Sequence, residues 1–240
     1  MVMDAMRELL TVFTVLFAGL AAGGGFVVLE GFFRDKLQDL FDDVNYFIFF
    51  FLVSGYFLYA LGEVSFYLMK VIAGDESVIG IADVYWFAGA ILIVVSFLAL
   101  LITSWKDERS SSRLFGTLGV IFLALAVVTY VLFGFIPESD SLSFFNYFYP
   151  LMSALIVAIS FSVLFFFEQH EHFSMPLFMF FLASVGILLG DVLFAISSAQ
   201  GIYLTGGLGS VTDIFYTLGY GLSLLAFVMF RFRMHQAAEL

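Results

Sequence analysis

The stretch GSVTDIFYTLGYG, residues 209 to 221, opens the last long apolar segment of the chain with one aspartate, three aromatic residues and three glycines. The segment LSLLAFVMF follows it directly. An earlier stretch, ADVYWFAG at residues 82 to 89, places an aspartate and aromatic residues before another apolar segment. Aromatic residues gather where a membrane helix meets the aqueous phase, so both stretches are typical of the polar end of a membrane-spanning helix.

The composition of the chain predicts an integral membrane protein. Hydrophobic residues make up 62% of the 240 positions and charged residues only 12%, whereas soluble domains average about a quarter charged residues. The lipid bilayer is therefore the expected partner of most of the surface. The net charge of −11 argues against nucleic acid as a partner, because that contact needs clustered lysine and arginine. The absence of cysteine excludes disulfides and thiolate chemistry.

Apolar runs long enough to cross the hydrocarbon core recur along the chain. We therefore expect an all-α fold, a seven-transmembrane-helix bundle that forms a single membrane domain over residues 1–240. An odd number of spans places the termini on opposite sides. The predicted spans are 8–30, 45–73, 82–105, 114–136, 145–167, 174–199 and 211–230.

The basic residues predict the orientation of the bundle, because lysine and arginine near span ends favour the cytoplasm. Only Arg7 and Lys70 fall on the side of the N-terminus. We expect a multi-pass protein of the cell membrane with the N-terminus outside and the C-terminus cytoplasmic. The basic residues assigned to the cytoplasmic side are Arg34, Lys36, Lys106, Arg109, Arg113, Arg231 and Arg233.

Two sequence matches predict an internal duplication. The stretch GEVSF at 62–66 matches GDVLF at 190–194, and DVYWFAG at 83–89 matches DIFYTLG at 213–219, with offsets of 128 and 130 residues. The matches predict a 3+1+3 parallel internal repeat. Repeat one covers about 8–105, a linking helix 114–136, and repeat two about 145–230. Chance similarity between apolar segments is the alternative.

Four carboxylates near the predicted outer side are the candidate binding residues. Glu63 and Asp191 lie well inside their spans, where a carboxylate costs at least ~2.5–3.5 kcal/mol and usually faces a bundle interior or a watery cavity. Asp83 and Asp213 lie at the predicted starts of spans three and seven. The sequence thus predicts an outward-facing polar cavity for a small ligand, a proton or a cation. Helix capping is the alternative for Asp83 and Asp213.

Tyrosines accompany these acids at helical spacing. Tyr59 and Tyr67 are four residues from Glu63 on either side, which places them on one helical stripe. Tyr216 and Tyr220 follow Asp213 in the same way. We include these four tyrosines among the candidate ligand-binding residues, and an interfacial aromatic belt is the alternative.

The stretch EQHEH brings His170 and His172 close to two glutamates in a predicted cytoplasmic loop. Such a cluster can hold a divalent metal, but a polar turn explains it equally well. We therefore predict no metal site, and the sequence identifies no cofactor.

The passage from 190 to about 225 resembles the end of the multi-span sensory region at the N-terminus of many prokaryotic signalling proteins, such as membrane-bound GGDEF diguanylate cyclases and histidine kinases. The resemblance implies a sensory role and adds Tyr203 to the candidate residues. The chain ends ten residues after its last span, at residue 240. We therefore expect the signal to leave through a cytoplasmic partner or a homo-oligomer. The matching positions are Asp191, Gly201, Tyr203, Gly206, Asp213, Tyr216, Gly219 and Tyr220.

Three classes of function were weighed. A stand-alone sensory or receptor-like module that signals through a partner is the leading hypothesis. A transporter for small solutes, or one coupled to protons or cations, is the alternative, since parallel repeats occur in transport proteins. An enzyme is not expected, because the predicted spans contain no histidine and the chain has no cysteine or recognisable catalytic motif.

Overall fold

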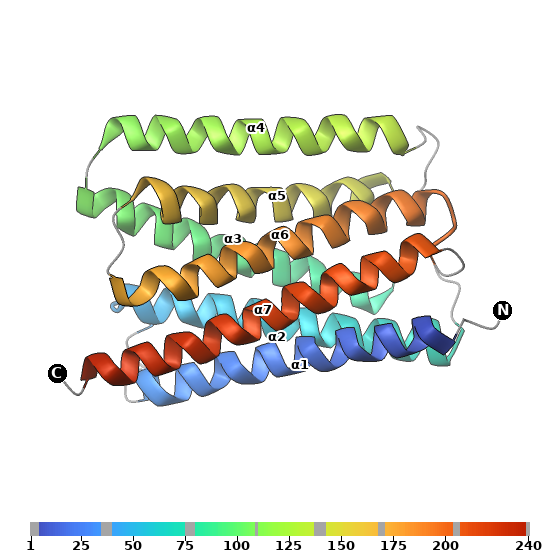
Figure 1. The fold of residues 1–240 in the computed structure, drawn as a ribbon, viewed down its shortest axis with the longest axis horizontal. Coiled ribbons are helices and arrows are strands. Elements are labelled where there is room, and N and C mark those ends of the chain that lie inside the picture. The colour runs from blue at the N-terminus through green and yellow to red at the C-terminus, as the bar shows by residue number, and fades with distance from the viewer. Residues whose placement is uncertain are drawn as a thin grey trace.

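The computed structural model describes residues 5–34, 40–74, 80–108, 110–136, 143–167, 171–203 and 207–238. Its helices run side by side along one axis, and the two termini lie at opposite ends of the bundle (Figure 1). We call the end that holds the N-terminus the N-terminal end. The helices are α1 (Ala5–Phe33), α2 (Val44–Phe66), α3 (Ile81–Glu108), α4 (Ser111–Phe135), α5 (Ser143–Phe166), α6 (Glu171–Ala199) and α7 (Gly207–Ala238), with a short π-helix η2 (Tyr67–Ile72) continuing α2.

The described part of the chain contains seven helices long and apolar enough to cross a membrane. Each of these segments has 23 to 27 residues, and 23 residues at 1.5 Å each already exceed the ~30 Å of a hydrocarbon core. This agrees with the predicted number of spans. The seventh helix begins at Gly207, four residues before the predicted start at 211, so Asp213 lies in the second turn of α7.

Polar residues start two of these helices. The Asp43 carboxylate caps α2 by accepting hydrogen bonds from the backbone N–H groups of Asn45 and Tyr46, at 3.0 and 3.1 Å. The Ser110 hydroxyl caps α4 by accepting from the N–H of Arg113 at 3.5 Å. The loop segments between apolar runs thus supply the groups that satisfy the free N–H donors of the next helix.

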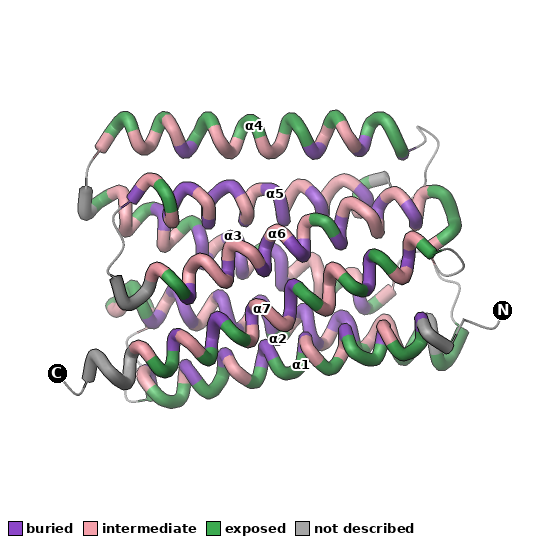
Figure 2. Tube along the Cα trace, viewed as in Figure 1, coloured by how far each residue is buried: buried purple, intermediate pink, exposed green. Residues whose placement is uncertain are grey.

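Six helices form a closed ring. Along the chain, α1 packs on α2, α2 on α3, α3 on α5, α5 on α6 and α6 on α7, and α7 returns to pack on α1. Helix α4 lies outside this ring against α5, at one side of the bundle (Figure 1). Its surface is mostly exposed, whereas buried residues line the facing sides of the ring helices (Figure 2). The interior of the ring is therefore the place where a site can be built.

The two halves of the ring interior differ in chemistry. Away from the N-terminal end, aromatic rings fill it: Phe180 packs on Phe227 with ring centroids 5.0 Å apart, and Phe49 packs on Phe230 at 4.3 Å. The half nearer the N-terminal end buries polar groups. They include Arg7, Thr11, Thr14, Glu63, Ser153, Asp191 and Asp213.

Candidate functional site

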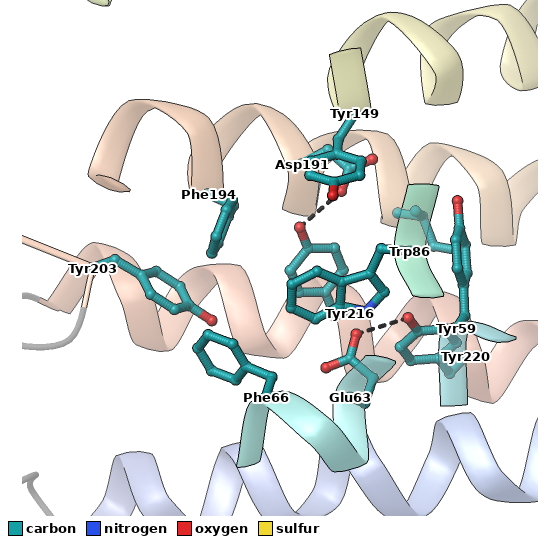
Figure 3. Close-up of a pocket in the computed structure, with 11 residues that line it drawn as sticks. Tyr59, Glu63, Phe66, Trp86, Tyr149, Asp191, Phe194, Tyr203, Tyr216 and Tyr220 are labelled. Carbon is teal, nitrogen blue, oxygen red and sulfur yellow. Dashed lines mark hydrogen bonds between the residues drawn. The ribbon is translucent and has the colours of Figure 1, made fainter. Parts of the chain in front are cut away.

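A cavity lies in the polar half of the ring, between α2, α3, α5, α6, α7 and the turn that precedes α7 (Figure 3). It offers about 40 Å³ to the centres of water-sized atoms, which is room for about three waters. Two carboxylates and eight aromatic rings make up nearly the whole wall. The lining residues are Tyr59, Glu63, Phe66, Trp86, Tyr149, Ile187, Asp191, Phe194, Tyr203, Tyr216 and Tyr220.

Glu63 reaches the cavity from α2 and is 6% exposed. Its Oε1 accepts a hydrogen bond of 2.8 Å from the hydroxyl of Tyr220 on α7. The buried indole nitrogen of Trp86 approaches the Glu63 carboxyl group but does not reach hydrogen-bond geometry with any described residue (Figure 3). Glu63 thus keeps an oxygen, Oε2, that no hydrogen bond within the described residues engages.

Asp191 enters the same cavity from α6 and is 9% exposed. Its Oδ1 accepts a 2.8 Å hydrogen bond from the hydroxyl of Tyr216 on α7, and its Oδ2 accepts one from the hydroxyl of Ser153 on α5. Three helices therefore fix the orientation of this side chain. Every described donor to the two cavity acids is a neutral hydroxyl group, so neither acid has a cation partner among the side chains that the structure describes, which do not include that of Lys70.

Glycines permit the close packing that forms the cavity walls. Trp86 lies against Gly62, so closely that a Cβ at residue 62 would overlap the indole ring. Tyr216 lies against Gly190, where a Cβ would come within 2.7 Å of the phenol ring. Cβ atoms essentially never approach other heavy atoms so closely, so these rings occupy space that a larger residue would fill. Gly62 and Gly190, which directly precede the two cavity acids, therefore each leave the space that one aromatic side chain of the wall occupies.

Asp213 lies beside the cavity and does not line it. Its Oδ1 accepts a 2.7 Å hydrogen bond from the Tyr203 hydroxyl, and its Oδ2 accepts one of 3.1 Å from Thr11 on α1. The Nε of Arg7 lies 3.9 Å from Oδ2, and the Arg7 guanidinium lies over the Tyr203 ring, 4.5 Å from its centroid. The carboxylate therefore ties α1 and the 200–203 turn to α7. The interpretation of Asp213 as an N-terminal cap is wrong, because α7 begins a full turn earlier.

Burial raises the pKa of the Tyr203 hydroxyl well above its usual range, and the neighbouring Asp213 carboxylate raises it further. Tyr203 therefore keeps its proton at neutral pH and can act as the donor to Asp213. Because the same ring lines the cavity, the Asp213 contacts position one wall of the site.

Asp83 also lies outside the cavity wall, and its contacts are those of a cap. Its Oδ2 accepts a 2.8 Å hydrogen bond from the backbone N–H of Gly80, which precedes α3. The hydroxyl of Tyr149 lies 3.2 Å from Oδ1 and 3.1 Å from the Asp83 carbonyl oxygen. Asp83 thus stabilises the start of α3 and orients Tyr149, a residue of the wall.

Tyr67 is half-buried and does not line the cavity. It begins η2, where the backbone N–H of Ala73 bonds to the carbonyl of Leu68, five residues back, at 2.9 Å. Tyr67 itself keeps the α-helical bond from its N–H to the Glu63 carbonyl, and the wider π-turns affect the residues after it. Tyr59 and Glu63 precede this change and keep the predicted face.

Of the sequence-predicted residues, the structure brings six together in the cavity wall: Tyr59, Glu63, Asp191, Tyr203, Tyr216 and Tyr220. Four aromatic residues of the wall lie outside the candidate set: Phe66, Trp86, Tyr149 and Phe194. For three of them a signal exists in the internal matches. Phe66 corresponds to Phe194 at the 128-residue offset, and Trp86 corresponds to Tyr216 at the 130-residue offset.

A second, smaller cavity adjoins the first on its inner side, since Tyr59 and Ile187 belong to both walls. It offers about 10 Å³ to water-sized centres, the room needed by about one water. Tyr56, Ser153 and Ser184 belong to its wall together with three isoleucines, and nearly all of the wall surface is apolar. The open space therefore extends toward the middle of the ring, where the phenylalanine packing begins.

The described residues hold no group of three or more histidine, cysteine, aspartate or glutamate side chains arranged for a metal ion. The side chains of His170 and His172 lie outside the described part of the structure. The prediction about that cluster therefore stays untested.

Comparison of the chain with protein-family models, with curated proteins and with solved structures gave no match. The function is therefore argued from the geometry of the cavity.

Proposed function

We propose that this protein is a sensory or receptor-like module of the cell membrane, in which the cavity faces outward, binds a small ligand or cation, and passes the signal to a partner. The observation that carries the proposal is that Glu63 and Asp191 lie in one cavity, and that no side chain described by the structure is a cation partner to either of them. Buried carboxylates are costly unless a proton, a cation or a ligand compensates them. Two of them in one small chamber favour a binding site.

The closed inner half of the ring favours binding over free passage. Beyond the second cavity, the interior contains the fully buried Phe227, Ile159 and Val53. Dispersion contacts between such side chains leave no space for water. A ligand that enters the cavity therefore meets a closed floor, as a receptor site requires.

The contacts around the glycines support the proposed duplication. Gly62 against Trp86 corresponds to Gly190 against Tyr216 at the two sequence offsets. In the ring, α1 packs on α7, and the equivalent helices α5 and α3 pack on each other. In the first pair the Thr11 hydroxyl of α1 donates to Asp213 of α7. In the second pair the Tyr149 hydroxyl of α5 donates to Asp83 of α3. Matched contacts between matched residues are what two copies of a three-helix unit produce, on either side of a linking α4.

The basic residues support the outward orientation of the cavity. Arg34, Arg231 and Arg233 lie at the end away from the cavity and follow the tendency of basic residues toward the cytoplasm. Arg7 lies at the N-terminal end, but it is 4% exposed and paired with Asp213. Because the Arg7 charge is neutralised by Asp213 inside the bundle, it is not a free basic residue at the membrane surface and does not count against this orientation.

The resemblance of the passage from 190 to about 225 to prokaryotic membrane sensory regions also favours a sensor. Four positions of the resembling pattern form two tyrosine–aspartate pairs, Tyr216 with Asp191 and Tyr203 with Asp213. The pattern thus includes side chains that build and position the cavity wall.

A proton- or cation-coupled transporter is the second candidate, and the inner cavity favours it. The Ser223 hydroxyl donates a 2.7 Å hydrogen bond across the ring to the hydroxyl of Tyr56, whose ring contacts Phe180 and Phe227. A conformational change that separated Phe180 from Phe227 would connect this polar interior to the other side. In that case Glu63 and Asp191 are the sites that take up the cation or proton.

A single-tryptophan protein tests the proposal. Trp86 and Trp105 are the two tryptophans of the chain. The Trp105→Phe protein therefore keeps one tryptophan, Trp86, which lies in the cavity wall. Reconstituted into liposomes of known orientation, Trp86 should be quenched by acrylamide added on the side of the N-terminal end, within seconds of mixing. A sensor gives this access without ion flux. A transporter adds proton or cation uptake that Glu63→Gln and Asp191→Asn abolish.

Matched controls are Glu30→Gln and Asp42→Asn, which change the same groups at exposed positions at the other end of the bundle. The proposal is overturned when Trp86 resists acrylamide from the N-terminal end while the protein is folded by circular dichroism.

A further inference from the structure

We propose that the ligand of this cavity is a small organic ammonium ion, a protonated amine or a compact quaternary ammonium group. The inference rests on the proposed binding function and names the chemical class that the wall selects. Three features carry it: the sign of the charge, the aromatic faces, and the size of the chamber.

The charge of the wall selects a cation. Of the described lining residues, two are acids and none is lysine, arginine or histidine. Glu63 retains a free acceptor in Oε2, and hydroxyl groups alone serve Asp191. An N–H donor that carries a positive charge supplies both the missing hydrogen bond and the missing countercharge.

The aromatic side chains form a box rather than a stack. The Trp86 and Tyr149 rings meet at 85° with centroids 6.3 Å apart, and Phe194 meets Tyr203 at 73° and 4.7 Å. Tyr59 and Tyr220 meet at 77° and 6.4 Å. These rings therefore stand in several orientations around the cavity that they line, and aromatic π-faces attract ammonium groups. Tyr203 already shows this chemistry, since the Arg7 guanidinium lies 4.5 Å from its centroid.

The same wall is poorly suited to a hard metal ion. Calcium takes six to eight oxygen ligands and magnesium near-octahedral oxygen geometry, whereas the wall is mostly carbon and the tyrosine hydroxyls of 216 and 220 already bind the acids. An ammonium ion needs only a few acceptors and gains from apolar contact. The chamber of about 40 Å³ limits the group to a few heavy atoms, the size of methylammonium or of an amine head group.

The test titrates the Trp105→Phe protein, in nanodiscs of phosphatidylglycerol, with methylammonium chloride and tetramethylammonium chloride. Sodium chloride at equal ionic strength is the reference salt. We expect a saturable change in Trp86 fluorescence with the ammonium ions and none with sodium. Glu63→Gln should weaken the apparent affinity by about tenfold or more, because a charge-assisted hydrogen bond is lost. Glu30→Gln should leave it unchanged.

A second variant separates the box from folding effects. Phe66→Leu keeps an apolar side chain but removes one π-face, and it should weaken tetramethylammonium binding several-fold. Its control is Phe122→Leu on α4, which alters a side chain that is 75% exposed and should have no effect. Equal affinity in Phe66→Leu and wild type overturns the aromatic box.

An amine head group of a lipid presents the same chemistry as a free amine, so the titration is repeated in nanodiscs that contain phosphatidylethanolamine. A fluorescence change on adding this lipid, with reduced response to methylammonium, identifies the lipid as the source. An unchanged titration identifies a soluble amine. A saturable, Glu63-dependent response to sodium or to a pH step alone overturns the ammonium class but leaves the binding function standing. No response to any cation, with Trp86 closed to acrylamide, overturns both.

Discussion

The ion pair between Arg7 and Asp213 makes the sharpest prediction about stability. The two side chains are 4% and 3% exposed, and the pair joins α1 to α7, the contact that closes the ring. Asp213→Asn leaves the Arg7 guanidinium buried without its counterion. Removing one partner of a buried pair costs about 3–5 kcal/mol. We expect a loss at the lower end, about 3 kcal/mol, because one of the two hydroxyl donors, Tyr203 or Thr11, can still donate to the amide oxygen.

The assay is reversible unfolding in mixed micelles of dodecyl sulfate, followed by helix content. The double variant Arg7→Met with Asp213→Asn removes the stranded cation and should recover most of the loss. Glu30→Gln is the matched control, since its pairing with Arg34 joins side chains that are 74% and 76% exposed and should contribute no more than about 1 kcal/mol. An Asp213→Asn protein as stable as the Glu30→Gln protein would refute the role given to this pair.

Three further predictions follow from particular residues. Gly62→Ala should lower the unfolding free energy by about 1–3 kcal/mol, because the added Cβ would overlap Trp86. Gly119→Ala, whose Cβ would meet nothing within 4 Å, should leave it unchanged. The same unfolding assay checks both variants. The folded-state pKa of Tyr203 lies above its unfolded value of about 10, so its contribution to stability should be constant below that pH and fall above it. Tyr203→Phe should reduce the loss of unfolding free energy measured between about pH 9.5 and 11. Because the chain has no cysteine, Ile202→Cys and Phe41→Cys each introduce one thiol at an exposed site, at opposite ends of the bundle. An impermeant maleimide added outside cells should label the Ile202→Cys protein and leave the Phe41→Cys protein unlabelled. The reverse labelling pattern would contradict the proposed orientation.

The features set by local chemistry were predictable from the sequence. The number of spans follows from apolar length, and the shared cavity of Glu63 and Asp191 follows from the cost of a carboxylate in lipid. The helical spacing of Tyr216 and Tyr220 placed both on the cavity side of α7, where each donates to one of these acids.

The features that depend on packing between helices were not predictable. No local pattern indicates that Tyr67 begins a π-helix, since Phe66, Leu68 and Met69 beside it are ordinary apolar residues. The contacts of Asp213 with Thr11 and Arg7 span 202 and 206 positions, so they depend on how the ring closes. Interfacial aromatic residues are common in membrane proteins, so Trp86 did not stand out except by its correspondence to Tyr216, and its place against Gly62 is a contact between helices.

The position of α4 has a topological consequence. Three helices reverse the direction of a chain, so a second three-helix unit joined directly to the first would enter the membrane upside down. One additional membrane crossing restores the original direction of the chain, and α5 therefore runs in the same direction as α1 (Figure 1). In the proposed duplication α4, which contributes no residue to the described cavity wall, is the return path between the two units. Co-expression of separate polypeptides for α1–α3 and α5–α7 should then rebuild the ring without it.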